Sequence, residues 1–215
     1  IYTGEDTLSL HDALPIFDTA SLSPAEAYRL LVGGVTPRPI AWISTRSTDG
    51  IDNIAPYSFF NVASCNPPIL WYSQVNPQSG QDKDTLRNLI ATRECVVHIV
   101  NSQLMQKMNL SCALLPPEQS EFDFAEIESC AGNSVEALAV RDSPIRYECH
   151  LREVIQLSSL PSGGTVALLD VKSIYVDDHL WNGTMINQQQ LDSVGKMGGD
   201  FYPNSRKTSG FSPRI

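Results

Sequence analysis

The sequence predicts a mainly β fold, a closed antiparallel barrel decorated by two or three helices. Three observations predict it. Apolar, β-rich runs follow one another without the strand–helix alternation of a parallel α/β sheet. Turn signals such as Thr48-Asp49-Gly50 and Pro161-Ser162-Gly163-Gly164 separate neighbouring runs. Helical periodicity is confined to a few short stretches, and no internal repeat is visible. A Greek-key-like barrel accommodates such a set of strands.

The first helix has clear start and stop signals. Ser23 fits the N-cap, Pro24 the first turn and Glu26 the capping-box position. The helix is expected to end at Gly33-Gly34, because glycine favours helix termination. The strands that follow are expected at about 38–46, 53–64 and 69–73.

In the second half of the chain, the expected helices and strands follow one another less regularly. Asp82 or Asp84 is expected to cap a helix that leads into an apolar strand at 95–100. A further helix is expected at about 102–113. The span 114–143 is acidic and irregular, so we expect a surface excursion there. Two long strands near 144–158 and 164–177 complete the predicted barrel.

The N-terminal sixteen residues are excluded from this interpretation. Residues 1–16 resemble the translation of a short-read sequencing adaptor, with Gly4 to Asp6 at the position of the sample index. A native N-terminal extension is the alternative. Residues 17–215 are then expected to form a single domain that carries the excursion at 114–143.

Charge and cysteine content narrow the class of partners. The chain has 15 Lys and Arg against 24 Asp and Glu, a formal net charge of −9, and no basic run. This balance argues against nucleic acid and anionic membranes as partners. The five cysteines form no C-x-x-C pair and have no histidine at metal-ligand spacing. We expect reduced thiols, no metal and a cytoplasmic location.

Two runs contain unusually small polar residues for β-strands. One extends from Pro37 to Thr45 and the other from Asn53 to Phe60, and both place Ala, Ser or Thr at expected core positions. Small side chains let a flat molecule with polar edges approach the strand backbone. The pattern favours a bound planar cofactor over a simple β core.

The start of the second helix is a candidate anion site. Lys83 and Thr85 lie where backbone N–H groups and the positive end of the helix dipole favour negative charge. Taken alone, the stretch also fits a capped surface helix with a solvated lysine. Beside the two small-residue strands, we interpret it as a phosphate site.

Five motifs in order resemble a known family. They are PRPIAWIST at 37–45, NIAPYSFF at 53–60, NPP at 66–68, KDTLRN at 83–88 and VGKMGGDFY at 194–202. From about Phe17 to the C-terminus the chain resembles the flavin-reductase-like, FMN-binding split-barrel proteins. The resemblance implies a homodimer with FMN held at the subunit interface.

The resemblance also implies the cofactor-binding residues. Ala41, Ser44 and Thr45 would approach the isoalloxazine ring, and Ser58, Lys83 and Thr85 would meet the phosphate, with Asn88 nearby. A second wall would be formed by Asn53, Ala55, Pro56 and Ser58, and Gly198 with Tyr202 would close over the flavin. Trp42 is included as a candidate, although a tryptophan in a strand is more typical of a core or an interface.

The expected activity follows from the cofactor. A flavin carries the chemistry itself, so no catalytic side chain is expected. The chain lacks a G-x-G-x-x-G motif, so NAD(P)H would bind in the open cleft and reduce the flavin, which would pass electrons to free flavin, oxygen or a partner protein. The alternatives are a flavoredoxin-like electron carrier that does not use NAD(P)H and a non-catalytic split barrel that binds a small ligand.

Two further residues have open interpretations. Arg38, between two prolines, fits either a phosphate or carboxylate contact or a structural ion pair. His98 lies in an apolar strand, where a hydrogen-bonded core histidine is more typical than an acid–base role. The family resembled commonly has Asn at that position, so His98 is a departure from its pattern.

Overall fold

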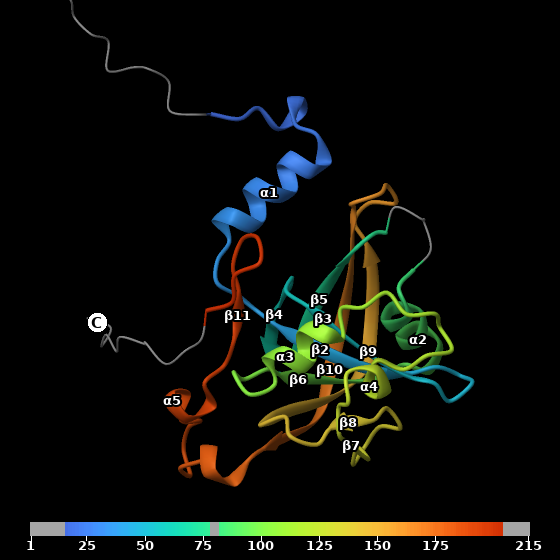
Figure 1. The fold of residues 1–215 in the computed structure, drawn as a ribbon, viewed down its shortest axis with the longest axis vertical. Helices are drawn as coiled ribbons and strands as arrows, with labels where there is room; N and C mark the ends of the chain where they lie inside the picture. Colours follow the sequence, from blue (N-terminus) through green and yellow to red (C-terminus); the bar gives the residue numbers. More distant parts are fainter. Residues whose placement is uncertain (1–15, 78–81, 204–215) are drawn as a thin grey trace, which may run out of the picture.

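The fold is built around one seven-stranded antiparallel sheet, seen in the computed structural model in Figure 1. The structure describes residues 16–77 and 82–203, so residues 1–15 of the expected adaptor segment lie outside it. The strand order is β3-β2-β6-β9-β10-β5-β4. Two small two-stranded sheets, β1-β11 and β7-β8, flank it.

The strands have the following bounds: β1 Arg38–Pro39, β2 Ala41–Arg46, β3 Asp52–Tyr57, β4 Phe60–Cys65, β5 Pro68–Val75, β6 Glu94–Ile99, β7 Ser129–Cys130, β8 Ala139–Val140, β9 Ile145–Gln156, β10 Gly164–Val176 and β11 Gly195–Lys196. The helices are α1 Pro24–Gly34, α2 Asp84–Thr92, α3 Met105–Leu110, α4 Glu121–Phe124 and α5 Gln188–Leu191, with 3₁₀ turns η1 Thr19–Ser21 and η2 Asp178–Leu180.

The sheet curls into a split barrel. In the described part of the chain, β3 and β4 are the two edges of the hydrogen-bonded order, so the ladder does not close. The chain nevertheless passes directly from β3 to β4 through Ser58 and Phe59, and the Ser73 N–H of β5 donates to the Phe59 carbonyl at 2.8 Å. The mainly antiparallel fold is therefore confirmed, in the split form.

Two of the expected strands are interrupted. The strand expected at 38–46 is broken at Ile40, where β1 leaves the main sheet to pair with β11. The strand expected at 53–64 is broken at Ser58 and Phe59, where the chain turns from one sheet edge to the other. Sequence alternation does not reveal these breaks because both sides remain β-rich.

The helices differ from expectation at their ends. Ser23 caps α1 in a full capping box with Glu26, as expected. By contrast, the expected Asp82 or Asp84 cap of α2 is wrong, because Lys83 occupies the N-cap and makes no side-chain capping bond. The helix expected at 102–113 is shorter, since α3 spans only Met105–Leu110.

The segment 114–143 is only partly a surface excursion. Leu114 is fully exposed, but Phe122, Ala125 and Ile127 are buried against Trp42 and Ile54 on the outer face of β2 and β3. The expectation of a surface segment is wrong for this part, because its apolar residues are spaced too irregularly for a sequence pattern to show that they pack together. A second core fills the barrel interior, around residues such as Ile43, Tyr72, Val97, Cys149 and Leu169.

Helix α1 stands away from the barrel in Figure 1, beside the C-terminal segment that contains β11. Of its own residues only Val32 is buried. No helix in the described ranges is both long and apolar enough to cross a membrane.

Candidate functional site

Two adjoining cavities are lined in part by residues of β3. The larger, of about 740 Å³, lies between α1 and the β3–β4 corner. The smaller, of about 470 Å³, lies between β3, the start of α2 and the segment 111–121. Pro56, Tyr57 and Lys83 line both. Each volume is within the range of small-molecule sites, and together they form the candidate site.

Lys83 lies where the two cavities meet. Its ammonium nitrogen is 5.6 Å from the centre of the Tyr57 ring, a cation–π distance. Loss of hydration in this position lowers the pKa of Lys83. Within the described residues it forms no ion pair, and no side chain caps the first N–H groups of α2. The site therefore offers one full positive charge and uncapped helix donors to an anion.

Asn53 organises the buried polar groups next to Lys83. Its Oδ1 accepts from the Thr85 hydroxyl at 2.8 Å and from the Thr45 hydroxyl at 3.4 Å. Asn88 Nδ2 donates to Thr45 Oγ1 at 3.3 Å. Thr85 lines the smaller cavity, but its proton is directed to Asn53, so it must rotate to donate to a ligand. Thr45 and Asn88 are buried and line neither cavity.

Glu121 of α4 fixes the orientation of Asn53. Its Oε2 accepts from Asn53 Nδ2 at 2.9 Å and from the Ile54 N–H at 3.1 Å. Burial raises the pKa of Glu121, and these hydrogen bonds oppose that rise. Because the Asn53 amide nitrogen faces Glu121, its oxygen must face the two threonines.

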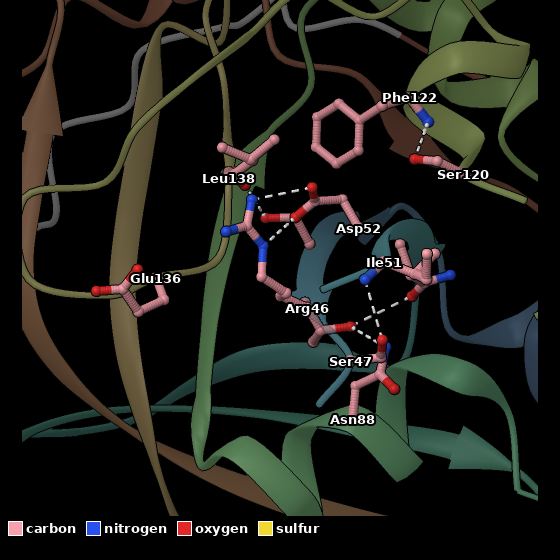
Figure 2. Close-up of polar contacts among 12 residues, drawn as sticks. Arg46, Ser47, Ile51, Asp52, Asn88, Ser120, Phe122, Glu136 and Leu138 are labelled. Atoms are coloured by element: carbon pink, nitrogen blue, oxygen red, sulfur yellow. Dashed lines mark hydrogen bonds and ion pairs between the residues drawn. The ribbon is translucent and has the colours of Figure 1, made fainter. Parts of the chain in front are cut away.

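The outer end of the β2–β3 hairpin is anchored on both sides. Figure 2 shows the Arg46–Asp52 ion pair, with Phe122 and Leu138 on one side and Asn88 of α2 on the other. The pair is bidentate, with nitrogen–oxygen distances of 2.9 and 3.0 Å. This geometry holds β3, and so Asn53, in register with β2.

Residues of β3 and of the β3–β4 corner form the wall between the cavities. Ala55 lines the smaller cavity, Ser58 the larger, and Pro56 both. Proline at this edge position presents no N–H, and the Ile54 N–H is taken by Glu121. The free edge of the sheet is thereby protected from pairing with another strand.

The β2 side chains lie inside the protein. Ala41, Trp42 and Ser44 are completely buried. Trp42 Nε1 donates to Ser111 Oγ at 2.9 Å, and the Ser44 hydroxyl donates to the Leu138 carbonyl at 2.6 Å. The polar atoms of Trp42 and Ser44 therefore form hydrogen bonds inside the protein. Contact between β2 and a flavin stays a prediction.

The late glycine segment lies beside α1. A Cβ on Gly198 would be 3.3 Å from the Cα of Gly33, so the two segments approach closely there. Tyr202 packs under Lys196, whose ammonium is 4.0 Å from the ring centre. Neither residue lines the two cavities, so closure over a ligand by Gly198 and Tyr202 stays a prediction.

Arg38 and His98 are both structural. Arg38 donates to backbone carbonyls and to Ser58, which differs from both of its expected roles. His98 Nδ1 lies 2.7 Å from the Trp42 carbonyl, and its Nε2 accepts from the Val140 N–H at 2.9 Å. Burial lowers the pKa of His98 to about 3, so it is a neutral core histidine, as its strand context favours. The described ranges contain no cluster of three or more metal-ligating side chains.

Several residues at the site were not found from sequence. Tyr28 and Arg29 of α1 line the larger cavity, and Glu121 and Cys112 the smaller. All four lie outside the strand and helix-start motifs. The many acidic residues around Glu121 indicate solvent exposure, so the sequence does not reveal that the Glu121 carboxylate is buried.

The chain is similar in sequence and in fold to known proteins. A model of the flavin reductase like domain matches residues 33–192. An uncharacterized protein from Halalkalibacterium halodurans is 36% identical over 184 residues, 85% of this chain and 88% of that protein. Nitrilotriacetate monooxygenase component B from Bacillus cereus superposes with a TM-score of 0.88 at 29% identity, covering 94% of this chain and 100% of that one. The nitroreductase NbaA of Pseudomonas fluorescens shares the fold, with a TM-score of 0.84 at 23% identity over 93% and 96% of the chains.

Proposed function

The chain belongs to the flavin reductase like domain family, and from that premise we propose that it is an FMN-dependent oxidoreductase that uses NAD(P)H. In this proposal, electrons leave the flavin for free flavin, oxygen or a partner protein. The observation that carries the proposal is the position of Lys83 at the N-terminus of α2, where two cavities meet and where it forms no ion pair with a described residue.

The residues present fit a flavin phosphate. Lys83 and the uncapped N–H groups of α2 supply donors, and Ser58 and Thr85 lie to either side of Lys83. Asp84 does not compete as a free negative charge, because Arg87 forms an ion pair with it. Glu121 is held by Asn53 and Ile54. Asp82 also lines the smaller cavity, so the positive charge and hydrogen-bond donors for the phosphate are those of Lys83 and the start of α2.

The protein would bind and orient the cofactor. Bound FMN supplies the hydride and electron transfer chemistry. Lys83 and the α2 N–H groups would hold its phosphate, and the Ala55–Pro56 wall would leave space for a flat ring system. The absence of long side chains on that wall keeps a ring face accessible to a nicotinamide. We further propose a homodimer with the flavin at the subunit interface, in the cytoplasm.

The proposal is tested by reducing the FMN-loaded protein with NADH and with NADPH without oxygen. Bleaching of the flavin band at roughly 450 nm is expected with at least one of them. Bleaching with neither nucleotide would contradict NAD(P)H use and leave the electron-carrier function. Sedimentation velocity of the same sample tests the homodimer.

A second measurement separates flavin binding from fold. The double variant Lys83→Ala, Thr85→Ala is expected to lose FMN on gel filtration. The control variant Lys172→Ala, Thr184→Ala, whose two residues line neither cavity, is expected to retain it. Retention of FMN by the first variant would mean that the phosphate assignment is wrong. A wild-type protein that never binds FMN would instead favour a non-catalytic ligand-binding barrel.

A further inference from the structure

Two cysteines face each other inside the barrel. Cys95 of β6 and Cys149 of β9 are direct partners in the antiparallel register of these two strands. Both thiols are free, and both residues are completely buried in the core that fills the barrel interior. The other cysteines in described strands, Cys65 and Cys130, lie opposite residues of other types. The register therefore brings two sulfur atoms to one point of the barrel interior.

The backbone spacing at this point suits a disulfide bond. The Leu151 N–H donates to the Arg93 carbonyl at 2.8 Å, and Cys149 and Cys95 lie two residues further along the same ladder. Hydrogen-bonded partners recur at every second residue of an antiparallel pair, and their Cα atoms are about 5.5 Å apart. Disulfides join Cα atoms that are about 4.4–6.8 Å apart, so β6 and β9 need not separate to accommodate the bond.

The two thiols already interact. A hydrogen bond with the Cys95 thiol raises the pKa of the Cys149 thiol well above its ordinary value, and burial adds to this rise. The thiolate is the reactive form of cysteine, so a buried thiol with a raised pKa is oxidised slowly. Slow oxidation distinguishes this pair from the exposed thiols of Cys65 and Cys112.

We propose that Cys95 and Cys149 form a redox modification site, at which a peroxide closes a reversible disulfide bond between β6 and β9. One sulfur attacks a peroxide oxygen, the O–O bond breaks, and a sulfenic acid and one water molecule are produced. The second sulfur attacks the sulfenic sulfur, so the S–S bond forms, the S–O bond breaks and a second water molecule leaves. The two thiols thus lose two electrons and two protons, and hydrogen peroxide is reduced to water.

The bond would join two parts of the main sheet. In the strand order, β3, β2 and β6 lie on one side of this junction, and β9, β10, β5 and β4 lie on the other. A covalent link between distant positions of the chain restricts the unfolded state and so stabilises the folded one. The oxidised protein is therefore expected to withstand a higher urea concentration than the reduced protein.

The experiment treats the flavin-free Cys65→Ser, Cys112→Ser, Cys130→Ser variant with hydrogen peroxide, so that only the buried pair carries thiols. Thiol titration in denaturant is expected to show the loss of both thiols, and mass spectrometry of unreduced peptides should link Cys95 to Cys149. Dithiothreitol should restore both thiols. The midpoint of urea unfolding should be higher before this reduction than after it.

Cys95→Ala in the same background is the matched control, because it keeps Cys149 and removes its partner. It should form no intramolecular link, and its urea midpoint should not rise with peroxide. Because alanine in the core can weaken the fold, peptides of the peroxide-treated wild-type chain provide a second measurement, and they should contain the same link.

Two titratable thiols after prolonged exposure, or sulfinic acids in place of the link, would overturn the proposal. A linked protein with an unchanged urea midpoint would overturn the stabilising role of the bond. The inference goes beyond the proposed function and does not depend on it, because the peroxide is added and no flavin is present. Its failure would therefore leave the proposed function untouched.

Discussion

Single polar side chains do most of the organising around the candidate site. In sequence, the small hydroxyl residues of β2 indicate a ligand site. In the fold, however, the Ser44 hydroxyl donates to the Leu138 carbonyl and the Thr45 hydroxyl donates to Asn53 Oδ1. Both side chains are buried in β2, and they support β3, the neighbouring strand whose residues line the cavities. At the scale of a residue, the sequence motifs predict small polar groups in β2 and β3, but they do not show which way these side chains point.

Glu121 provides a test of this arrangement. Both of its hydrogen bonds go to one oxygen, so Glu121→Gln can keep them while removing the charge. Because burial raises the pKa of Glu121 above 4.5, the unfolded chain releases this proton first, and wild-type stability falls relative to the variant as pH rises from that value. Urea unfolding at several pH values measures the difference.

The matched variant Glu121→Ala removes both acceptors. It leaves the Ile54 N–H and the Asn53 amide unsatisfied, which is expected to cost about 2–3 kcal/mol of unfolding free energy. An alanine variant as stable as Glu121→Gln would show that these two bonds contribute nothing.

His98 predicts a pH dependence of the opposite sign. Its pKa is about 3 in the fold against 6.5 normally, so the unfolded chain binds the proton first as pH falls below 6.5. The stabilisation that follows from the lowered pKa of His98 is complete above pH 6.5. It decreases by about 1.4 kcal/mol for each pH unit between pH 6.5 and pH 3. His98→Gln lacks this loss, so the stability gap between wild type and variant should narrow by about 2 kcal/mol from pH 7.5 to pH 5. A constant gap in urea unfolding would contradict the neutral, buried histidine.

At the scale of elements, α1 depends on one side chain. Arg38 donates to the carbonyls of Val32 in α1 and of its C-cap residue Val35, and also to the Met197 carbonyl of the C-terminal segment. Since only Val32 of the helix is buried, these bonds are its main attachment. We expect Arg38→Met to lose hydrogen-exchange protection across α1 while β9 and β10 keep theirs. Glu26→Ala, which removes only the capping box, should affect the first turn alone. Equal loss in the barrel strands would mean that Arg38 supports the whole fold.

Elements with local signals were predictable, and those that depend on distant contacts were not. The Ser23 capping box and the long β9 and β10 strands follow from short sequence patterns. The turn at Ser58 and Phe59 and the burial of Phe122 arise only when the sheet curls. The same division holds for the candidate site. The motifs predict Lys83 and β3 as site residues, whereas only the fold brings Tyr28 and Arg29 of α1 to the same cavity.

At the scale of the whole molecule, positive charge is concentrated against an acidic background. The chain carries a net charge of −9, yet Arg29 and Lys83 line one cavity, and neither forms an ion pair with a described residue. An acidic chain repels anions in general, whereas cations that line a cavity attract an anion locally. The charge pattern therefore favours anion binding at this cavity.

This charge pattern predicts that the phosphate group dominates flavin affinity. FMN at about one hundred times its Kd should stabilise the native state by about 2.7 kcal/mol, a rise in Tm of roughly 5–10 °C for a chain of this size. Riboflavin has the same rings without the phosphate, so its shift at equal concentration should be much smaller. The difference between the two shifts should disappear in the Lys83→Ala, Thr85→Ala variant and persist in Lys172→Ala, Thr184→Ala. Equal shifts from FMN and riboflavin in the wild type would show that the rings alone determine binding, and the anion site at α2 would then have no part in holding the cofactor.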